Sequence, residues 1–138
     1  MKSVSIIAFF ILLLTSGTSI AQTFQEGNLI GVHTLRLNLN PDVTFNEYKA
    51  NFKANVAPAM KEYLEAEVYL LRSARGADAN SVGIIYIYES DAVRSKYWNQ
   101  DGSPSELWQT QIAKIQDIMD KNNELGTWSS DYNDWIVQ

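Results

Sequence analysis

The chain has 138 residues, no cysteine and a net charge of −5, with 16 acidic residues against 11 lysines and arginines. Such a surface repels phosphate backbones and anionic lipid headgroups, which argues against nucleic acid as a partner. Without cysteine, disulfides and a lipoprotein anchor are excluded, and the core must be stable by burial alone.

Residues 1–21 have the composition of a secretory signal peptide. Lys2 supplies a short basic region, Ile6 to Leu14 is an uninterrupted apolar run, and Ser19 and Ala21 are the small residues of a cleavage site. The apolar run is far shorter than the roughly 20 residues that span a bilayer, and no later segment is long enough. We therefore expect cleavage before Gln22, a secreted or periplasmic protein without membrane insertion, and one domain over residues 22–138. The alternative is an uncleaved amphipathic anchor.

The domain is predicted to begin with a strand and a helix. Residues from Leu29 to Leu39 alternate between apolar and polar, which predicts a strand whose leucines share one face. Residues 44–47, Thr-Phe-Asn-Glu, match a capping box and predict a helix start. An apolar stripe at helical spacing follows, and it comprises Phe45, Tyr48, Phe52, Val56, Ala59 and Tyr63. Pro58 lies inside this pattern and is expected to kink or split the helix near Asn55.

Two strands are predicted in the middle of the chain, Glu67 to Arg75 and Ser81 to Glu89, joined by the turn-rich residues 76–80. The second strand is apolar on both faces, because Val82, Ile84, Tyr86 and Tyr88 alternate with Gly83, Ile85 and Ile87. A strand of this kind is covered on both sides, so we expect it at the centre of the sheet.

The last third of the chain predicts two further helices and a strand. A short helix from Asp91 to Trp98 leads into a loop, and residues 103–106, Ser-Pro-Ser-Glu, match a second capping box. The helix that follows runs to about Leu125, with a buried stripe of Trp108, Ile112, Ile115 and Met119. Gly126 is a natural stop. Thr127 to Val137 is polar in its middle, as an edge strand can be.

The predicted order of strand, helix, strand, strand, helix and strand is typical of an α+β, ferredoxin-like βαββαβ fold. In that fold a four-stranded antiparallel sheet carries two helices on one face. The other sheet face would meet water, and the doubly apolar strand argues against such exposure. A homodimer packed sheet against sheet is therefore expected. The alternative is a monomer whose open face is merely rich in Thr, Tyr and Arg.

Several segments resemble a dimeric α/β-barrel domain, over essentially the whole of residues 22–138. They are Gly31 to Thr34, Asn40 to Val43, Gly83 to Ser90, the Tyr97-Trp98 step with its Gly-Ser-Pro-Ser loop, and Asp134 to Val137. The resemblance implies a ligand cavity between sheet and helices in each subunit and a dimer barrel through the other sheet face. That superfamily includes cofactor-independent monooxygenases, haem-degrading and haem-dependent enzymes, isomerases and members without known activity, so the fold does not name the function.

His33 and Tyr86 are the candidate catalytic residues. His33 is the only histidine and shares strand parity with Leu35, so it faces the presumed cavity if that leucine faces the helices. There it would be a general base or an axial haem ligand. Tyr86, with Tyr88 on the same strand face, would orient a substrate oxygen or donate a proton. The alternatives are a histidine with one ring nitrogen hydrogen-bonded to a backbone group, and core tyrosines whose hydroxyls reach water.

Arg72, Trp98 and Trp108 are the candidate ligand-binding residues. The two tryptophans, with Trp135, would wall an apolar pocket for an aromatic molecule, or simply fill the layer between helices and sheet. Arg72 and Arg75 would bind a carboxylate bidentately, or discourage pairing at an exposed edge strand.

No metal and no cofactor is expected. The acidic pair Asp131 and Asp134 lacks metal-ligand spacing and a nearby histidine, so a solvated surface accounts for it better. The sole histidine lies in the first strand rather than in a helix, which departs from the haem-degrading pattern. The sequence thus favours an exported dimeric domain that binds a small apolar or aromatic molecule, without a demonstrable catalytic motif. The alternative is a cofactor-independent monooxygenase or isomerase in which His33 and a tyrosine handle protons.

Overall fold

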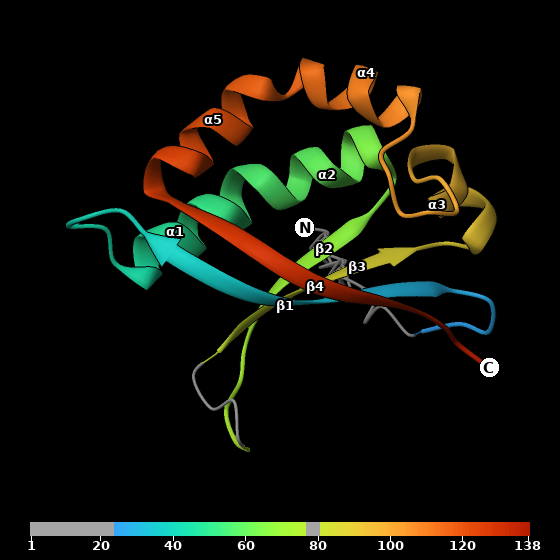
Figure 1. Ribbon diagram of the computed structural model, residues 1–138, viewed down its shortest axis with the longest axis horizontal. Helices are drawn as coiled ribbons and strands as arrows, with labels where there is room; N and C mark the ends of the chain where they lie inside the picture. The colour runs from blue at the N-terminus through green and yellow to red at the C-terminus, as the bar shows by residue number, and fades with distance from the viewer. Residues whose placement is uncertain (1–23, 77–80) are drawn as a thin grey trace, which may run out of the picture.

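The computed structural model describes residues 24–76 and 81–138, so the expected signal peptide and the cleavage site before Gln22 lie outside the described residues. The described elements, in chain order, are β1 (Leu29–Leu39), α1 (Phe45–Asn51), η1 (Phe52–Val56), α2 (Ala57–Leu64), β2 (Glu67–Arg72), β3 (Val82–Tyr88), α3 (Asp91–Tyr97), α4 (Glu106–Lys114), α5 (Gln116–Leu125) and β4 (Gly126–Ile136). The long helical arms α1–η1–α2 and α4–α5 lie together on one face of a twisted sheet (Figure 1).

The four strands form one antiparallel sheet in the order β2-β3-β1-β4, which puts β1 and β3 at the centre. This order confirms the predicted ferredoxin-like α+β fold and the central place of the doubly apolar strand. Strand β1 has its predicted bounds. Strands β2 and β3 are shorter than predicted, because β2 already ends at Arg72 and β3 begins only at Val82.

The hydrophobic core lies between the sheet and the two helical arms. Tyr48 and Leu64 from the first arm and Ile84 from β3 are fully buried, and Leu29 and Leu35 of β1 face the same layer. The leucine face of β1 is therefore the core face, as the alternation predicts. Burial of this layer is the main stabilising term in a chain without disulfides.

The first helical arm begins at the predicted capping box. The Thr44 Oγ1 atom accepts from the Glu47 N–H at 3.3 Å, and the Glu47 carboxylate accepts from the Thr44 N–H at 2.7 Å. The kink or split expected at Pro58 takes a milder form. The helix continues through the π turn η1, in which the Ala57 N–H donates to the Phe52 carbonyl five residues back. Pro58 has no N–H for a regular helical bond, so the wider turn accommodates it without ending the helix.

The second helical arm departs from the prediction at its start. Ser105 is the N-cap of α4, because its Oγ accepts from the Trp108 N–H at 3.1 Å. Ser103 instead donates its hydroxyl to Asp101 at 2.6 Å. The capping box predicted over residues 103–106 is therefore wrong. The arm is also divided at the buried residue Ile115 into α4 and α5, where the sequence predicts one helix.

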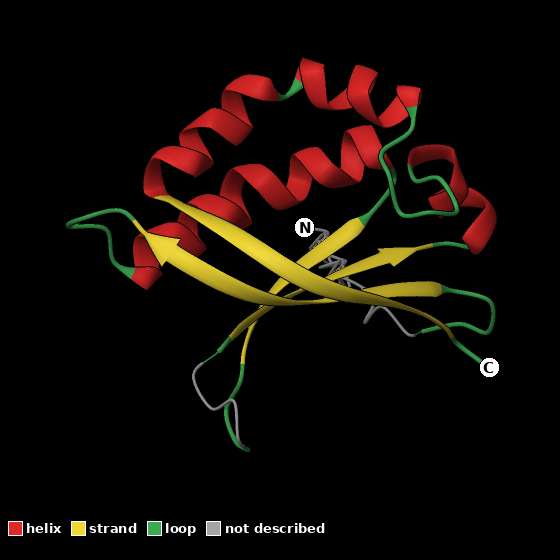
Figure 2. Ribbon diagram, viewed as in Figure 1, coloured by secondary structure: helices red, strands yellow, loops and turns green. Residues whose placement is uncertain are grey.

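The opposite face of the sheet carries none of the described helices (Figure 2). Val32, Tyr69, Leu71 and Trp135 are exposed there, and the Trp135 side chain, on edge strand β4, is the most exposed of them at 61%. We call these four residues, together with Ile85 of β3, the open-face band. Among the described helices, none is both long and apolar enough to cross a membrane.

Candidate functional site

A cavity of about 180 Å³ lies between the sheet and the helices. Aromatic side chains from β3, from the segment after α3, from α4 and from β4 form most of its wall; these are Tyr86, Tyr88, Trp98, Trp108, Trp128 and Tyr132. Met60, Leu64, Ile112 and Met119 close it from the helical arms. The rings of Trp98 and Trp108 lie 5.5 Å apart, tilted by 52°. The wall is therefore a rigid, largely apolar surface suited to a flat ring.

His33 lies at the sheet end of this cavity. Its Nδ1 is 3.1 Å from the Ser130 Oγ, and its ring is stacked on Tyr132 and tilted against Tyr86, with centroids 5.3 Å and 5.0 Å away. Burial lowers the pKa of the imidazole below its ordinary value, and the nearby negative charge of Asp134 opposes this only in part. The imidazole is therefore neutral near pH 7, with one nitrogen held by Ser130.

The Tyr86 hydroxyl differs from the Tyr86 ring, which contacts His33, in having no hydrogen-bond partner among the described residues. Within residues 24–76 and 81–138 its hydroxyl forms no hydrogen bond, although the side chain lines the cavity. Burial raises the pKa of Tyr86 far above its ordinary value, and the nearby Tyr88 and Tyr48 add to the rise. The group stays protonated under ordinary conditions, so it is a donor available to a ligand atom.

The hydroxyl of Tyr88, by contrast, is engaged. It accepts a hydrogen bond from the Trp98 Nε1 at 3.1 Å, which fixes the indole against the cavity wall. Burial also raises the pKa of Tyr88, more than its bond to Trp98 and the charge of Arg94 lower it. The two tyrosines of β3 thus have different roles: Tyr88 orients Trp98, and Tyr86 lines the cavity.

An ion pair between Arg94 and Asp134 forms the polar end of the cavity. The Arg94 Nη2 lies 2.8 Å from the Asp134 Oδ2, and the two side chains are only 11% and 29% exposed. The Arg94 Nη1 also donates to the carbonyl oxygens of Trp98 and Asn99, at 3.2 Å and 3.1 Å. Arg94 therefore ties the end of β4 to the loop that follows α3.

Two glycines keep the cavity open. A Cβ on Gly31 would lie 3.1 Å from the Asp134 Oδ1 and 3.8 Å from the His33 Nε2, so a side chain there would crowd the polar end. Gly102 has a φ of 81°, and a Cβ at this position would collide with the Tyr132 hydroxyl. The loop after α3 can approach β4 this closely because residue 102 is glycine.

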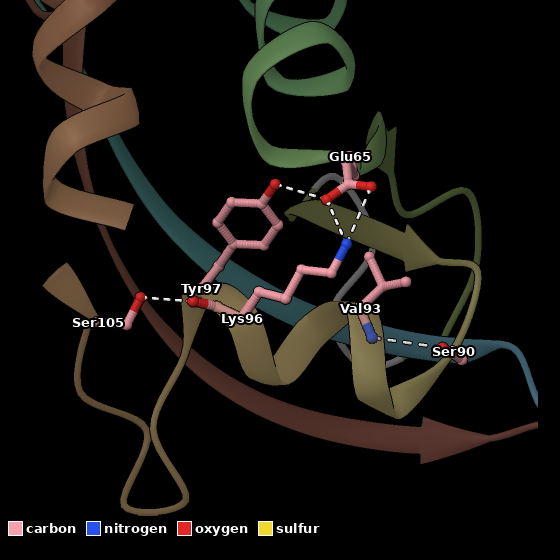
Figure 3. Close-up of polar contacts among 6 residues, drawn as sticks. All are labelled: Glu65, Ser90, Val93, Lys96, Tyr97 and Ser105. Carbon is pink, nitrogen blue, oxygen red and sulfur yellow. Dashed lines mark hydrogen bonds and ion pairs between the residues drawn. The ribbon is translucent and has the colours of Figure 1, made fainter. Parts of the chain in front are cut away.

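Helix α3, which carries Arg94, is held at both ends (Figure 3). The Ser90 Oγ caps its start by accepting from the Val93 N–H at 3.3 Å. The Ser105 hydroxyl donates to the Lys96 carbonyl at 2.7 Å, so one serine both caps α4 and ties it to α3. These caps fix the position of α3 relative to the second helical arm.

Glu65 fastens α3 to the end of α2. Its carboxylate accepts from the Tyr97 hydroxyl at 2.7 Å and from the Lys96 Nζ at 2.9 Å (Figure 3). Burial, followed by the bond to Glu65, raises the pKa of Tyr97 to about 12. The Lys96 contact is exposed and contributes little, but the tyrosine bond is partly buried. The network holds the segment from which Arg94 and Trp98 reach the cavity.

The structure brings four of the five predicted site residues together. His33, Tyr86, Trp98 and Trp108 line the same cavity. Arg72 does not line it, because its guanidinium lies on the outer strand β2, 5.4 Å from the centroid of the Phe45 ring. Trp135, also considered for the wall, lies in the open-face band.

The sequence did not identify Arg94, Asp134, Trp128 or Tyr132 as site residues. Both aspartates are exposed residues, as expected, but Asp134 also pairs with the buried Arg94, whereas Asp131 pairs with the exposed Arg36. Strand alternation could have separated the two aspartates, since positions 128, 132 and 134 share one face and 131 has the other. In the part of the chain that is described, no group of three His, Cys, Asp or Glu residues could hold a metal ion.

Comparison with family models and with curated proteins finds no match to this chain. Similar solved structures include the following three. The protein SnoaB, a cofactor-independent oxygenase from Streptomyces nogalater, is 15% identical (81% of this chain and 94% of that chain covered, TM-score 0.45). An uncharacterized NIPSNAP-like domain protein from Burkholderia xenovorans is 13% identical (83% and 88%, TM-score 0.50). A dimeric protein of unknown function from Bacteroides fragilis, with a ferredoxin-like fold, is 9% identical (83% and 100%, TM-score 0.43).

At such identities the likeness shows the fold alone. The strand order β2-β3-β1-β4 with the helical arms on one face is the ferredoxin-like α+β fold that the sequence predicts. It fixes no activity and no ligand for this chain, because one scaffold serves many functions.

Proposed function

We propose that the protein binds a small aromatic molecule in the cavity between sheet and helices. The observation that carries this proposal is an apolar space of about 180 Å³ walled by six aromatic side chains. One of them is Tyr86, whose hydroxyl forms no hydrogen bond with any described residue. An apolar cavity of roughly 150 Å³ holds a benzene molecule. The volume therefore suits one ring with a small substituent.

The walls favour a ring and one polar contact orients it. Tilted and stacked aromatic side chains, such as Trp98 with Trp108, offer edge and face contacts that a flat ligand can use. The Tyr86 hydroxyl can donate to a ligand without the loss of an existing bond, because it forms no hydrogen bond with any described residue. A ring that carries an oxygen should therefore bind better than a ring of the same shape without one.

Phenol and toluene test this proposal, because they match in shape and differ in the hydroxyl. Titration calorimetry should show phenol binding about tenfold more tightly than toluene, the worth of one good hydrogen bond. In Tyr86→Phe that preference should largely disappear. Tyr63→Phe, on the first helical arm outside the cavity wall, is the matched control and should behave as the wild type. Failure of the wild type to bind either probe would overturn the proposal.

A second candidate function, cofactor-independent proton-transfer chemistry such as an isomerisation or oxygenation, is supported by His33. Its imidazole is neutral and lines the same cavity as Tyr86. A base at this place would exchange an acidic carbon-bound proton of a bound ligand with solvent. NMR of a small aryl ketone in D₂O would detect that exchange, which should be lost in His33→Gln. Absence of any protein-dependent exchange speaks for binding without catalysis.

Two properties of the whole protein belong to the proposal. The open-face band supports pairing of two copies sheet against sheet, because exposed Val32, Tyr69, Leu71 and Trp135 are costly to leave in water. The signal-peptide pattern of residues 1–21 supports export to the periplasm or the medium. Mass spectrometry of the native protein should find Gln22 as the first residue, and an intact Met1 would refute export by cleavage.

A further inference from the structure

The cavity holds one positive and one negative side chain, and each neutralises the other. The Arg94 Nη2 and the Asp134 Oδ2 are 2.8 Å apart, with Arg94 buried and the Asp134 side chain 29% exposed. The Arg94 Nη1 is occupied as well, since it donates to the Trp98 and Asn99 carbonyls. The guanidinium therefore has a charged partner and two backbone partners before any ligand enters.

His33, Tyr86 and Tyr88, which also line the cavity, are uncharged at neutral pH. Burial lowers the pKa of His33 and raises the pKa values of Tyr86 and Tyr88. An anionic ligand would have to separate Arg94 from Asp134 or lie beside the aspartate. A cationic ligand would have to separate the same pair or lie beside the arginine. Either event leaves one member of the ion pair without its partner, and the loss weighs most on Arg94, which is buried and little screened by water.

The position of Asp134 is set by the sheet. Asp134 is opposite Gly31 of β1 in the register, and its Oδ1 would lie 3.1 Å from a Cβ on that glycine, so the missing side chain makes room for the carboxylate. Asp131, three residues earlier, points to the opposite face and pairs with Arg36 with both side chains exposed. Of these two aspartates of β4, only Asp134 therefore lies on the cavity side of the sheet.

We infer that Asp134 determines the charge specificity of the cavity: by occupying Arg94 it excludes aromatic carboxylates and restricts the ligand to an uncharged aromatic molecule with a hydrogen-bonding oxygen. This inference rests on the proposed binding function and names the ligand class of that same site. Arg94 would otherwise be a ready partner for a carboxylate, because guanidinium and carboxylate match in geometry.

Three probes of nearly equal shape test the inference: benzamide, benzoate and benzamidinium, which are neutral, negative and positive. Titration calorimetry with the full chain at about pH 8 keeps His33 neutral and each probe in one charge state. The wild type should bind benzamide at least about tenfold more tightly than either ion, which corresponds to about 1.4 kcal/mol. Equal or tighter binding of benzoate by the wild type would overturn the inference.

Asp134→Asn frees Arg94 while keeping an oxygen beside it. This variant should gain affinity for benzoate by about tenfold, with benzamide affected far less. Asp131→Asn is the matched control, because it makes the same charge change on the other face of the same strand and should alter none of the three affinities. An unchanged benzoate affinity in folded Asp134→Asn would overturn the inference.

The outcomes also separate this inference from the function on which it rests. If Asp134→Asn fails to fold, the comparison of the three probes on the wild type still decides the charge preference. If the wild type binds benzamide and benzoate alike, the cavity is a ligand site without the proposed selectivity. If no probe binds either protein, both the proposed function and the inference are wrong.

Discussion

Tyr48 and Tyr86 both lie in the layer between sheet and helices, but among the described residues only the Tyr48 hydroxyl has a hydrogen-bond partner. The Tyr48 hydroxyl accepts from the Asn122 Nδ2 at 3.3 Å, deep in the helical layer. The Tyr86 hydroxyl faces the cavity and forms no hydrogen bond with any residue of 24–76 or 81–138. A hydroxyl that is hydrogen-bonded within the protein stabilises the fold, whereas one without such a bond is available to a ligand.

The same substitution should therefore have unequal effects at the two positions. Tyr48→Phe strands the buried Asn122 amide and should lower the free energy of unfolding by about 1–2 kcal/mol. Tyr86→Phe should change it by no more than about 0.5 kcal/mol, because no bond is lost. Urea denaturation of both variants measures the difference. A loss at Tyr86 as large as that at Tyr48 would mean that its hydroxyl is already engaged.

His33 can be observed without assignment, because it is the only histidine of the chain. Burial lowers its pKa, so its NMR titration should have a midpoint below the ordinary value of about 6.5. The unfolded state then binds more protons than the folded state below that pH, and the free energy of unfolding falls as the pH is lowered. His33→Gln should weaken this dependence on the acid side of about pH 6.5. A midpoint at or above that value would contradict the buried, neutral imidazole.

Among the secondary-structure elements, those with strictly local signals were predicted well. Alternating residues fixed the bounds of β1, and the Thr44 and Glu47 pair fixed the start of the first helix. Gly126 ends α5 as predicted, although its φ of 174° is extended and places it at the start of β4. These signals lie within a few residues of one another, so no knowledge of the tertiary fold is needed.

The second helical arm shows where local signals mislead. Residues 103–106 match a capping box, yet Pro104 pairs with Trp98 in an isolated bridge, and residue 103 belongs to the loop. Ser105 caps α4 and also bonds to the Lys96 carbonyl of α3. That choice depends on a contact between two helices, which the spacing of serines does not contain.

Ser105→Ala and Ser103→Ala should differ accordingly. Loss of the Ser105 cap and of its tie to α3 should lower the free energy of unfolding by about 1–2 kcal/mol. Ser103→Ala removes only an exposed bond to Asp101 and should cost less than about 0.5 kcal/mol. Thermal or urea denaturation compares them. A larger loss of unfolding free energy in Ser103→Ala would indicate that Ser103 is the N-cap, as the sequence predicts.

For the candidate site, strand parity was enough to place His33 and Tyr86 on the cavity side. The Arg94 and Asp134 pair was not predictable in the same way, because it joins a short helix to the last strand and requires the β1–β4 register. Arg72 fails for a related reason: parity assigns it a face but not a distance from the cavity. The same alternation places Trp128 and Tyr132 of β4 on the cavity face, so they were missed although the sequence contains the signal. The ion pair needs the tertiary contact between α3 and β4.

For the molecule as a whole, the open-face band predicts a dimer. Light scattering of the mature protein at micromolar concentration should give twice the mass of one chain. Val32→Glu places a charge in the centre of the band and should yield a folded monomer, since Val32 is already exposed on a single chain. Ala113→Glu, on the exposed surface of α4, is the control and should remain dimeric. A wild-type monomer with cooperative unfolding would show that this face is tolerated in water.

The cavity between sheet and helices is the proposed ligand site. Crystals soaked with 4-bromophenol test it most directly, because the anomalous signal of bromine locates the ring without bias. We predict one peak per chain inside the cavity, against Trp108 and Ile112, with the phenol oxygen within hydrogen-bonding distance of the Tyr86 hydroxyl. An empty cavity with bromine only on the open-face band, or nowhere, would contradict the claim.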